Sequence, residues 1–138
     1  MSEQPRTGVA RAADEVSVAQ TLIDNGLPSQ AIARLFVAAR SAAEEVLARL
    51  DTVASSDSGT VALFVRLAVH ESTVDPHAGR LLRLLYDQQV AADQAAEWAD
   101  DDDADRAMED ARRFVALVRD WLNNPRGSGT RHESSQDC

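Results

Sequence analysis

The 138-residue sequence has no lysine, one cysteine and few aromatic residues, and these absences narrow both its fold and its function. Because Cys138 is the only cysteine, no disulfide can form within the chain, which favours a reducing cytoplasm. Aromatic residues make up 4% of the chain, and an alanine-rich, aromatic-poor interior suits closely packed helices better than a β-sandwich or barrel. No apolar run approaches the roughly 18 residues that span a bilayer, and no signal peptide is recognisable.

The charge of the chain is strongly acidic, and all 14 of its basic residues are arginine, for a net charge of −9. A GC-rich genome and adaptation to high salt both explain the absence of lysine. The concentration of acid in Asp100–Asp103 favours the genomic explanation. A net-acidic protein is not a general nucleic-acid binder, because such binding depends on neutralising phosphates. A local arginine patch could still contact RNA.

The stretch Ala31–Val53 has the clearest helical periodicity in the chain. Ile32, Ala39, Val46 and Val53 recur every seven residues, which predicts an apolar stripe along a helix roughly 35 Å long. Small alanines in its middle allow neighbouring helices to approach closely. One partner cannot cover both sides of this stripe, so the sequence predicts a bundle organised around this helix.

The rest of the chain predicts further helices and two irregular ends. Helices are expected over Val9–Asn25, Gly59–Glu71, Pro76–Trp98 and Ala104–Leu122. Residues 1–8 are expected to be a flexible N-terminus, and the Gly- and Ser-rich residues 123–138 a disordered tail. The predicted fold is therefore all-α, an antiparallel four- to five-helix bundle over residues 9–122.

Two polar pairs at i,i+4 spacing are candidates for chemistry. Arg66 and His70 are either an exposed surface pair or a contact for RNA phosphate with an acid–base group near neutral pH. Gln89 and Asp93 lie on or beside an apolar stripe, where they either hydrogen-bond across the bundle or line a cleft. Two further side chains of the same helix are candidates for cleft lining or partner contact: Tyr86 and Gln94.

No residue pattern points to a metal or a cofactor. The three histidines and one cysteine offer no paired-ligand spacing, and there is no Gly-rich phosphate loop. Asp100–Asp103 reads as a solvated helix cap, since consecutive aspartates do not converge on one ion. We therefore expect no metal site and no cofactor.

The order of these features resembles the HEPN superfamily of small α-helical proteins, in particular the branch often encoded beside minimal nucleotidyltransferases. The matching stretches are LIDNGLPSQAIARLFVAARSAAEEVL (Leu22–Leu47), SGTVALFVRLAV (Ser58–Val69), GRLLRLLYDQQVAAD (Gly79–Asp93) and AMEDARRFVALVRDWL (Ala107–Leu122). The resemblance implies a helical bundle, a homodimer, and descent from RNA-cleaving toxins, tRNA-modifying complexes or their inactive relatives. It also implies a nucleotidyltransferase-type partner in a toxin–antitoxin-like or RNA-related system.

The arginine–histidine spacing of active family members is not reproduced in the helical body. Many active members carry Arg, roughly four to six residues, and then His. Only three residues separate Arg66 from His70. Arg126 and His132 do match the spacing, but they lie in the tail, and a match by chance is expected in a chain with 14 arginines and three histidines.

Other positions of the family pattern have also lost their chemistry. In the nucleotidyltransferase-associated branch, the fourth helix more often shows Arg, three residues, then Asp-Tyr. Here Gln89 stands at the Arg position, Asp93 is retained, and Gln94 stands at the Tyr position. Asp57 replaces a His often found before the third helix, and Phe36-Val37 a Tyr-Tyr on the second. The loss of several such groups together favours a non-catalytic descendant.

Three readings follow from the sequence. The first is a non-catalytic, HEPN-like homodimeric interaction protein. The second is an active, metal-independent ribonuclease that uses Arg66, His70 and Asp93. The third is an acidic helical adaptor that binds a basic partner and is unrelated to RNA. A homodimer is also expected from the start of the fourth helix, because exposed apolar patches mark interfaces. Its leucines are Leu81, Leu82, Leu84 and Leu85.

Overall fold

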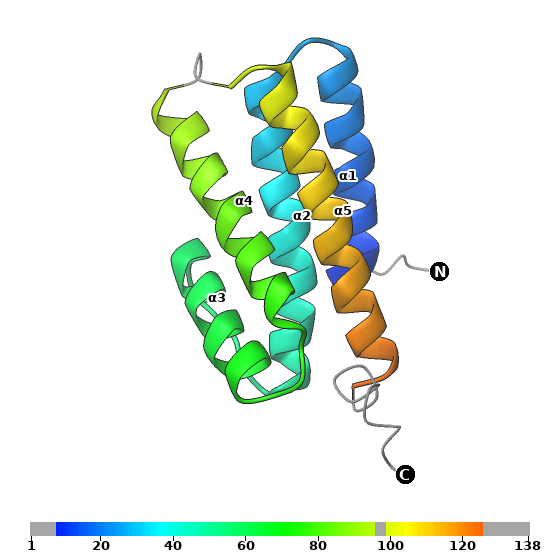
Figure 1. The fold of residues 1–138 in the computed structure, drawn as a ribbon, viewed down its shortest axis with the longest axis vertical. Helices are drawn as coiled ribbons and strands as arrows, with labels where there is room; N and C mark the ends of the chain where they lie inside the picture. The colour runs from blue at the N-terminus through cyan, green and yellow to red at the C-terminus, as the bar shows by residue number, and fades with distance from the viewer. Residues whose placement is uncertain (1–7, 96–98, 126–138) are drawn as a thin grey trace, which may run out of the picture.

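A computed structural model describes residues 8–95 and 99–125 and has an all-α architecture within them (Figure 1). Its elements are α1 (Gly8–Asp24), α2 (Pro28–Arg49), α3 (Asp57–Leu63), a π-helix η1 (Phe64–His70), α4 (Pro76–Gln94) and α5 (Asp101–Asn123). The four long helices lie side by side with alternating direction, and α3 and η1 pack beside α2 and α4. The predicted helical bundle is confirmed.

The helix α2 is the centre of the bundle, as the sequence predicts. It packs against every other helix, and 11 of its 22 residues are buried, against 8 of 23 in α5. Ile32, Ala39 and Val46 of the predicted stripe are fully enclosed. Because much of the buried surface of α2 is alanine, the neighbouring helices approach it closely, as Figure 1 shows.

The predicted C-terminal end of this helix was wrong. The helix stops at Arg49, and Val53, which was expected on the stripe, is 91% exposed. The Asp51 backbone adopts a left-handed conformation with φ of 58°, and the Thr52 amide donates to the Leu47 carbonyl at 2.8 Å. This is a Schellman-type ending, which aspartate tolerates better than most residues. The seven-residue repeat of apolar residues continues to Val53 by coincidence, so the repeat did not show that the helix ends at Arg49.

The third helix begins earlier than predicted and changes type halfway. Its N-cap is Ser56, whose hydroxyl accepts the Gly59 amide at 2.9 Å. From Phe64 onward the helix is a π-helix, in which hydrogen bonds run from i to i+5. Three apolar residues of α3 and η1 are buried in the core: Val61, Phe64 and Ala68.

The start of α4 agrees with the sequence, and its predicted end cannot be compared. The Asp75 side chain accepts the His77 amide at 2.8 Å, and Pro76 occupies the first turn, as predicted. The helix ends at Gln94, whereas the predicted end at Trp98 lies outside the described residues.

The start of α5 is fixed by a capping box. The Asp100 side chain accepts the Asp103 amide at 2.9 Å, and the Asp103 side chain accepts the Asp100 amide at 3.0 Å. The helix therefore begins at Asp101, before the predicted Ala104. Acidic side chains in this first turn interact favourably with the helix dipole.

The reason for expecting a homodimer through the fourth helix was wrong. Leu81, Leu82 and Leu85 are buried in the protein's own core, and only Leu84 is exposed, at 50%. The leucine-rich start of α4 therefore packs within the bundle on two sides instead of presenting a broad apolar patch. The homodimer itself stays a prediction.

The two ends of the chain fall mostly outside the described residues. Of residues 1–8 only Gly8 is described, and it opens α1. Of the expected tail, residues 123–125 are described. The Thr73 hydroxyl donates to the Pro125 carbonyl and accepts a hydrogen bond from the Trp121 indole at 2.7 Å. The first residues of the expected tail are therefore held against the bundle.

Candidate functional site

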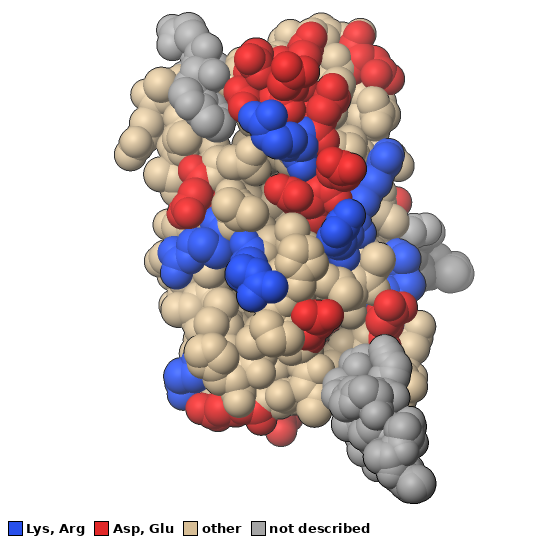
Figure 2. All heavy atoms as spheres, viewed as in Figure 1, with Lys and Arg blue, Asp and Glu red and all other residues tan. Residues whose placement is uncertain are grey.

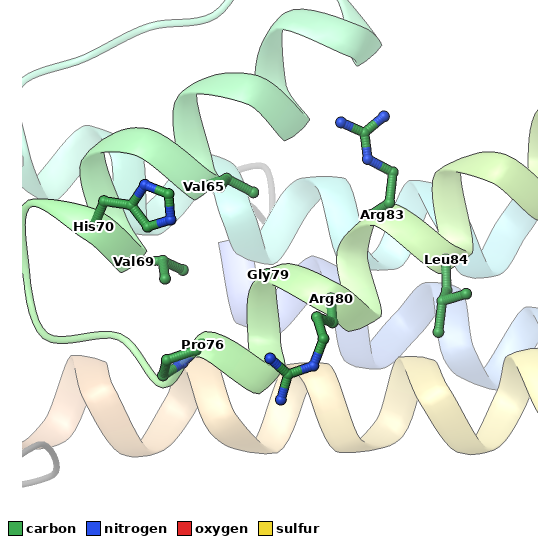
Figure 3. Close-up of a pocket in the computed structure, with 8 residues that line it drawn as sticks. All are labelled: Val65, Val69, His70, Pro76, Gly79, Arg80, Arg83 and Leu84. Carbon is green, nitrogen blue, oxygen red and sulfur yellow. The ribbon is translucent and has the colours of Figure 1, made fainter.

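A groove of about 500 Å³ lies between η1 and α4 and combines an apolar floor with a basic rim (Figure 3). Val65 and Val69 point from η1 toward Gly79 on α4 and form the floor. Pro76 and Leu84 extend the apolar surface along α4. The groove therefore has the mixed character of a surface that binds an amphipathic partner.

Gly79 is the residue that allows η1 and α4 to approach each other. A Cβ added at this position would lie 3.3 Å from Cγ2 of Val69 and 3.5 Å from Cγ2 of Val65. Glycine costs about 1 kcal/mol relative to alanine inside a helix, so its presence in α4 is explained by this close contact. Gly79 therefore lets the two helices meet at the base of the groove.

The rim of the groove carries three nitrogen-bearing side chains. Arg80 and Arg83 are exposed and extend from α4 in different directions, and His70 lies at the end of η1 (Figure 3). Neither arginine makes an ion pair or hydrogen bond with another residue in the described part of the chain. Their positive charge is therefore available to a partner.

The three residues proposed as catalytic are not brought together within one chain. His70 lines the groove, but Arg66 does not, and its guanidinium lies 3.9 Å from the Glu71 carboxylate, with both side chains about 60% exposed. Asp93 follows Gly79 by 14 residues of α4, which places it about 21 Å farther along the helix. It is exposed near the opposite end of α4.

The other candidates on α4 lie in different surroundings. Tyr86 is partly buried, and its ring packs on Phe36 with centroids 5.6 Å apart. Gln89 is half-buried and makes no hydrogen bond across the bundle within the described residues. Gln94 is exposed at the end of α4. None of these side chains lines the groove.

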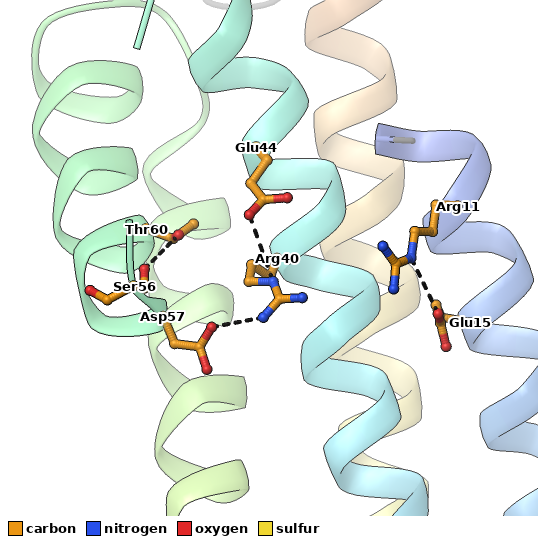
Figure 4. A network of polar contacts seen from close by, with 7 residues as sticks. All are labelled: Arg11, Glu15, Arg40, Glu44, Ser56, Asp57 and Thr60. Carbon is orange, nitrogen blue, oxygen red and sulfur yellow. Dashed lines mark hydrogen bonds and ion pairs between the residues drawn. The ribbon is translucent and has the colours of Figure 1, made fainter. Parts of the chain in front are cut away.

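Asp57 takes part in a contact between α2 and α3 (Figure 4). Its carboxylate lies 2.8 Å from the Arg40 guanidinium, which also faces Glu44 at 3.7 Å. The neighbouring Thr60 hydroxyl donates to the Ser56 carbonyl at 2.9 Å. Asp57 thus joins the start of α3 to the central helix.

A second hollow, of about 410 Å³, lies between α1 and α2 and is close to neutral. Val18, Leu22 and Val37 supply its apolar lining. Among the described residues Arg34 is its one charged lining residue, and it is paired with the Glu15 carboxylate at 2.9 Å, which also faces Arg11 at 3.3 Å. Val18 is 43% exposed. This surface therefore carries less net charge than the groove between η1 and α4.

The acidic residues gather where α5 begins, at the end of the bundle away from the groove (Figures 1 and 2). The amide and side chain of Asp103 hold the pKa of Asp100 below its ordinary value. Burial, followed by the charge of Glu109, raises the pKa of Asp110. In the described part of the chain, no three His, Cys, Asp or Glu side chains are positioned to share a metal ion.

The basic groove was not found from the sequence, and comparisons with known proteins add nothing to it. Arg80 and Arg83 read as ordinary surface arginines of a helix, and the available signal was Gly79 inside an otherwise helical stretch. No helix of the described residues is both long enough and apolar enough to cross a bilayer. No protein-family model, curated protein or solved structure matches the chain.

Proposed function

We propose that this chain is a HEPN-like protein that works by binding and does not cleave RNA. The observation that carries the proposal is the separation along α4 between Asp93 and the groove that His70 lines, since Asp93 lies about 21 Å beyond Gly79 and about 14 Å beyond Leu84, the last lining residue of that helix. General acid–base cleavage of a phosphodiester needs a titrating group and a cation close to the same phosphate. Neither is near Asp93 on its own helix, where Gln89 and Gln94 are neutral.

Asp93 alone is a poor catalyst for this reaction. Its carboxylate is exposed and negatively charged at neutral pH, so it repels the phosphate that it would have to approach. An active ribonuclease would need a second copy to bring His70 of one protomer beside Asp93 of the other. That arrangement is the alternative that an experiment must exclude.

The test is cleavage of total RNA by the wild-type chain, His70→Ala and Asp93→Asn. We expect no cleavage above the buffer control by any of the three proteins. Cleavage by wild type that is lost in both variants would overturn the proposal in favour of a ribonuclease. If an equimolar mixture of the two inactive variants then regained activity, the active site would lie between protomers.

We further propose that the protein forms a homodimer through the hollow between α1 and α2. A two-fold interface places the same patch of both copies face to face. The α1–α2 hollow suits this arrangement because it is apolar and its one charged residue, Arg34, is already paired. The groove between η1 and α4 does not, since its unpaired arginines would face each other.

A nucleotidyltransferase-type protein in the cytoplasm is the partner that the family resemblance suggests for this dimer. The third reading, an acidic adaptor for a basic partner, has one observation in its favour, the group of aspartates at the start of α5 (Figure 2). Co-purification with a nucleotidyltransferase encoded beside this protein would support the first partner. Binding to unrelated basic proteins, abolished by moderate salt, would support the second.

A further inference from the structure

We infer that the groove between η1 and α4 binds an acidic amphipathic helix of a partner protein. The inference rests on the proposed binding function and specifies where the partner docks and what chemistry it has. It is carried by the charge of the groove, which is opposite to that of the molecule. The chain has a net charge of −9, yet Arg80 and Arg83 on the groove are unpaired within the described residues.

The floor of the groove determines the shape of the partner. From Pro76 to Leu84 the lined part of α4 covers nine residues, a rise of about 12 Å, which matches two turns of a docked helix. Val65, Val69 and the 50%-exposed Leu84 offer aliphatic contacts for apolar residues spaced three and four apart. Carboxylates on the flanks of such a helix would meet Arg80 and Arg83, which extend in different directions from α4 (Figure 3).

Nucleic acid fits this groove less well than a peptide does. Proteins that bind single strands stack bases on aromatic side chains, and among the described residues no Phe, Tyr or Trp lines the groove. The strongly negative molecule would also repel a polyphosphate, since two arginines neutralise few phosphates. A peptide with a few carboxylates requires only the local charge.

The test uses a fluorescein-labelled synthetic peptide of about 16 residues, or four helical turns, with leucines on one face and glutamates on both flanks. One control peptide has lysine in place of glutamate. The other keeps the composition but scrambles the apolar stripe. Fluorescence polarisation with the full chain should show saturable binding of the first peptide and binding at least about tenfold weaker for both controls.

A matched pair of charge-reversal variants locates the site. Arg80→Glu/Arg83→Glu should weaken peptide binding by at least about tenfold. Arg112→Glu/Arg119→Glu changes the net charge equally on α5, at exposed positions that do not line the groove, and should leave binding within about twofold. If the first variant does not fold by circular dichroism, Leu84→Asp provides the same test, because Leu84 is already half exposed.

Several results would overturn the inference. These are equal binding of the scrambled peptide, equal loss in both charge variants, or no binding of the acidic peptide at all. Binding of a single-stranded RNA that disappears in Arg80→Glu/Arg83→Glu would assign the groove to nucleic acid. A molecular mass larger than that of a dimer in light scattering, lost in Arg80→Glu/Arg83→Glu, would show that the groove binds another copy of this chain. Absence of peptide binding without RNA cleavage would refute this inference and leave the proposed function standing.

Discussion

Asp110 is a half-buried carboxylate whose ionisation opposes folding. Burial is the main reason that its pKa is raised above the ordinary value of 3.8, and the neighbouring Glu109 adds to the effect. Between pH 3.8 and the raised pKa, the native state therefore holds the proton of the Asp110 carboxyl group more tightly than the unfolded state does. The contribution of Asp110 to stability is then most favourable below this window and decreases as pH rises through it.

Replacing Asp110 by asparagine should therefore stabilise the protein at neutral pH. We expect Asp110→Asn to raise the free energy of unfolding at pH 7 by less than about 1 kcal/mol, because the side chain keeps much of its contact with water. The gain should vanish well below pH 3.8, where aspartate is protonated in both states. Thermal melts at pH 7 and well below pH 3.8 measure this gain in stability. An equal gain at both pH values would assign the effect to something other than charge.

Phe36 is the residue that best reports on the packing of the core. It is 2% exposed on α2, and its ring packs at a tilt of 58° against Tyr86 of α4. Phe36→Ala should cost about 3–5 kcal/mol in chemical denaturation, because it removes buried apolar surface and leaves a cavity. Leu84→Ala, at a 50%-exposed position, should cost much less, roughly 1 kcal/mol or below. A loss below about 1 kcal/mol for Phe36→Ala would contradict its place in the core.

At the scale of the elements, the sequence predicted the helices well where local chemistry fixes them. The predicted start of α4 at Pro76 agrees with the structure, and the apolar stripe predicted the buried face of α2. The end of α2 was missed because the Schellman ending uses Asp51 instead of a glycine. The π-helix was also missed, since the spacing of apolar residues in Phe64–His70 fits either type of helix.

The start of α1 depends on a side chain from α2. The Val9 amide donates to the Glu45 carboxylate at 2.8 Å, while Gly8 turns the chain with φ of 60°. A Cβ on Gly8 would lie 1.9 Å from Glu45 Oε1, so glycine makes room for this contact. Glu45 therefore serves as an N-cap from a distant part of the sequence.

Removing this cap should destabilise α1 specifically. Glu45→Ala should lower the free energy of unfolding by about 0.5–2 kcal/mol and speed hydrogen exchange in the first turn of α1. Glu45→Gln keeps an acceptor oxygen and should lose less. Equal losses in the two variants, or unchanged exchange of these amides, would show that the contact does not cap the helix.

At the scale of the whole molecule, the functional surfaces depend on how distant segments come together. The sequence identified His70 as a candidate but joined it to Asp93, which lies at the far end of α4. It could not predict the groove, because the close contact of η1 and α4 depends on Gly79 meeting Val65 and Val69. Nor could it show that three of the four leucines of α4 are used within the bundle.

The proposed dimer gives a direct expectation for the molecular mass. Light scattering at micromolar concentration and moderate salt should give twice the chain mass for the wild type. Val18→Arg should give the monomer, because it places two like charges face to face in the apolar α1–α2 hollow. Leu84→Arg changes an exposed residue of α4 in the same way and should leave the dimer intact. A dimer lost in Leu84→Arg and kept in Val18→Arg would move the interface to α4.

Whether the protein cleaves RNA is the most direct test of a function in binding alone. The measurement is the cleavage rate of a labelled RNA with protein in excess, so that even one turnover per molecule is detected. We predict a rate equal to that of the buffer from pH 6 to pH 8, a range in which an active histidine would titrate. Cleavage by the wild type that depends on His70 and Asp93 would contradict a purely binding function.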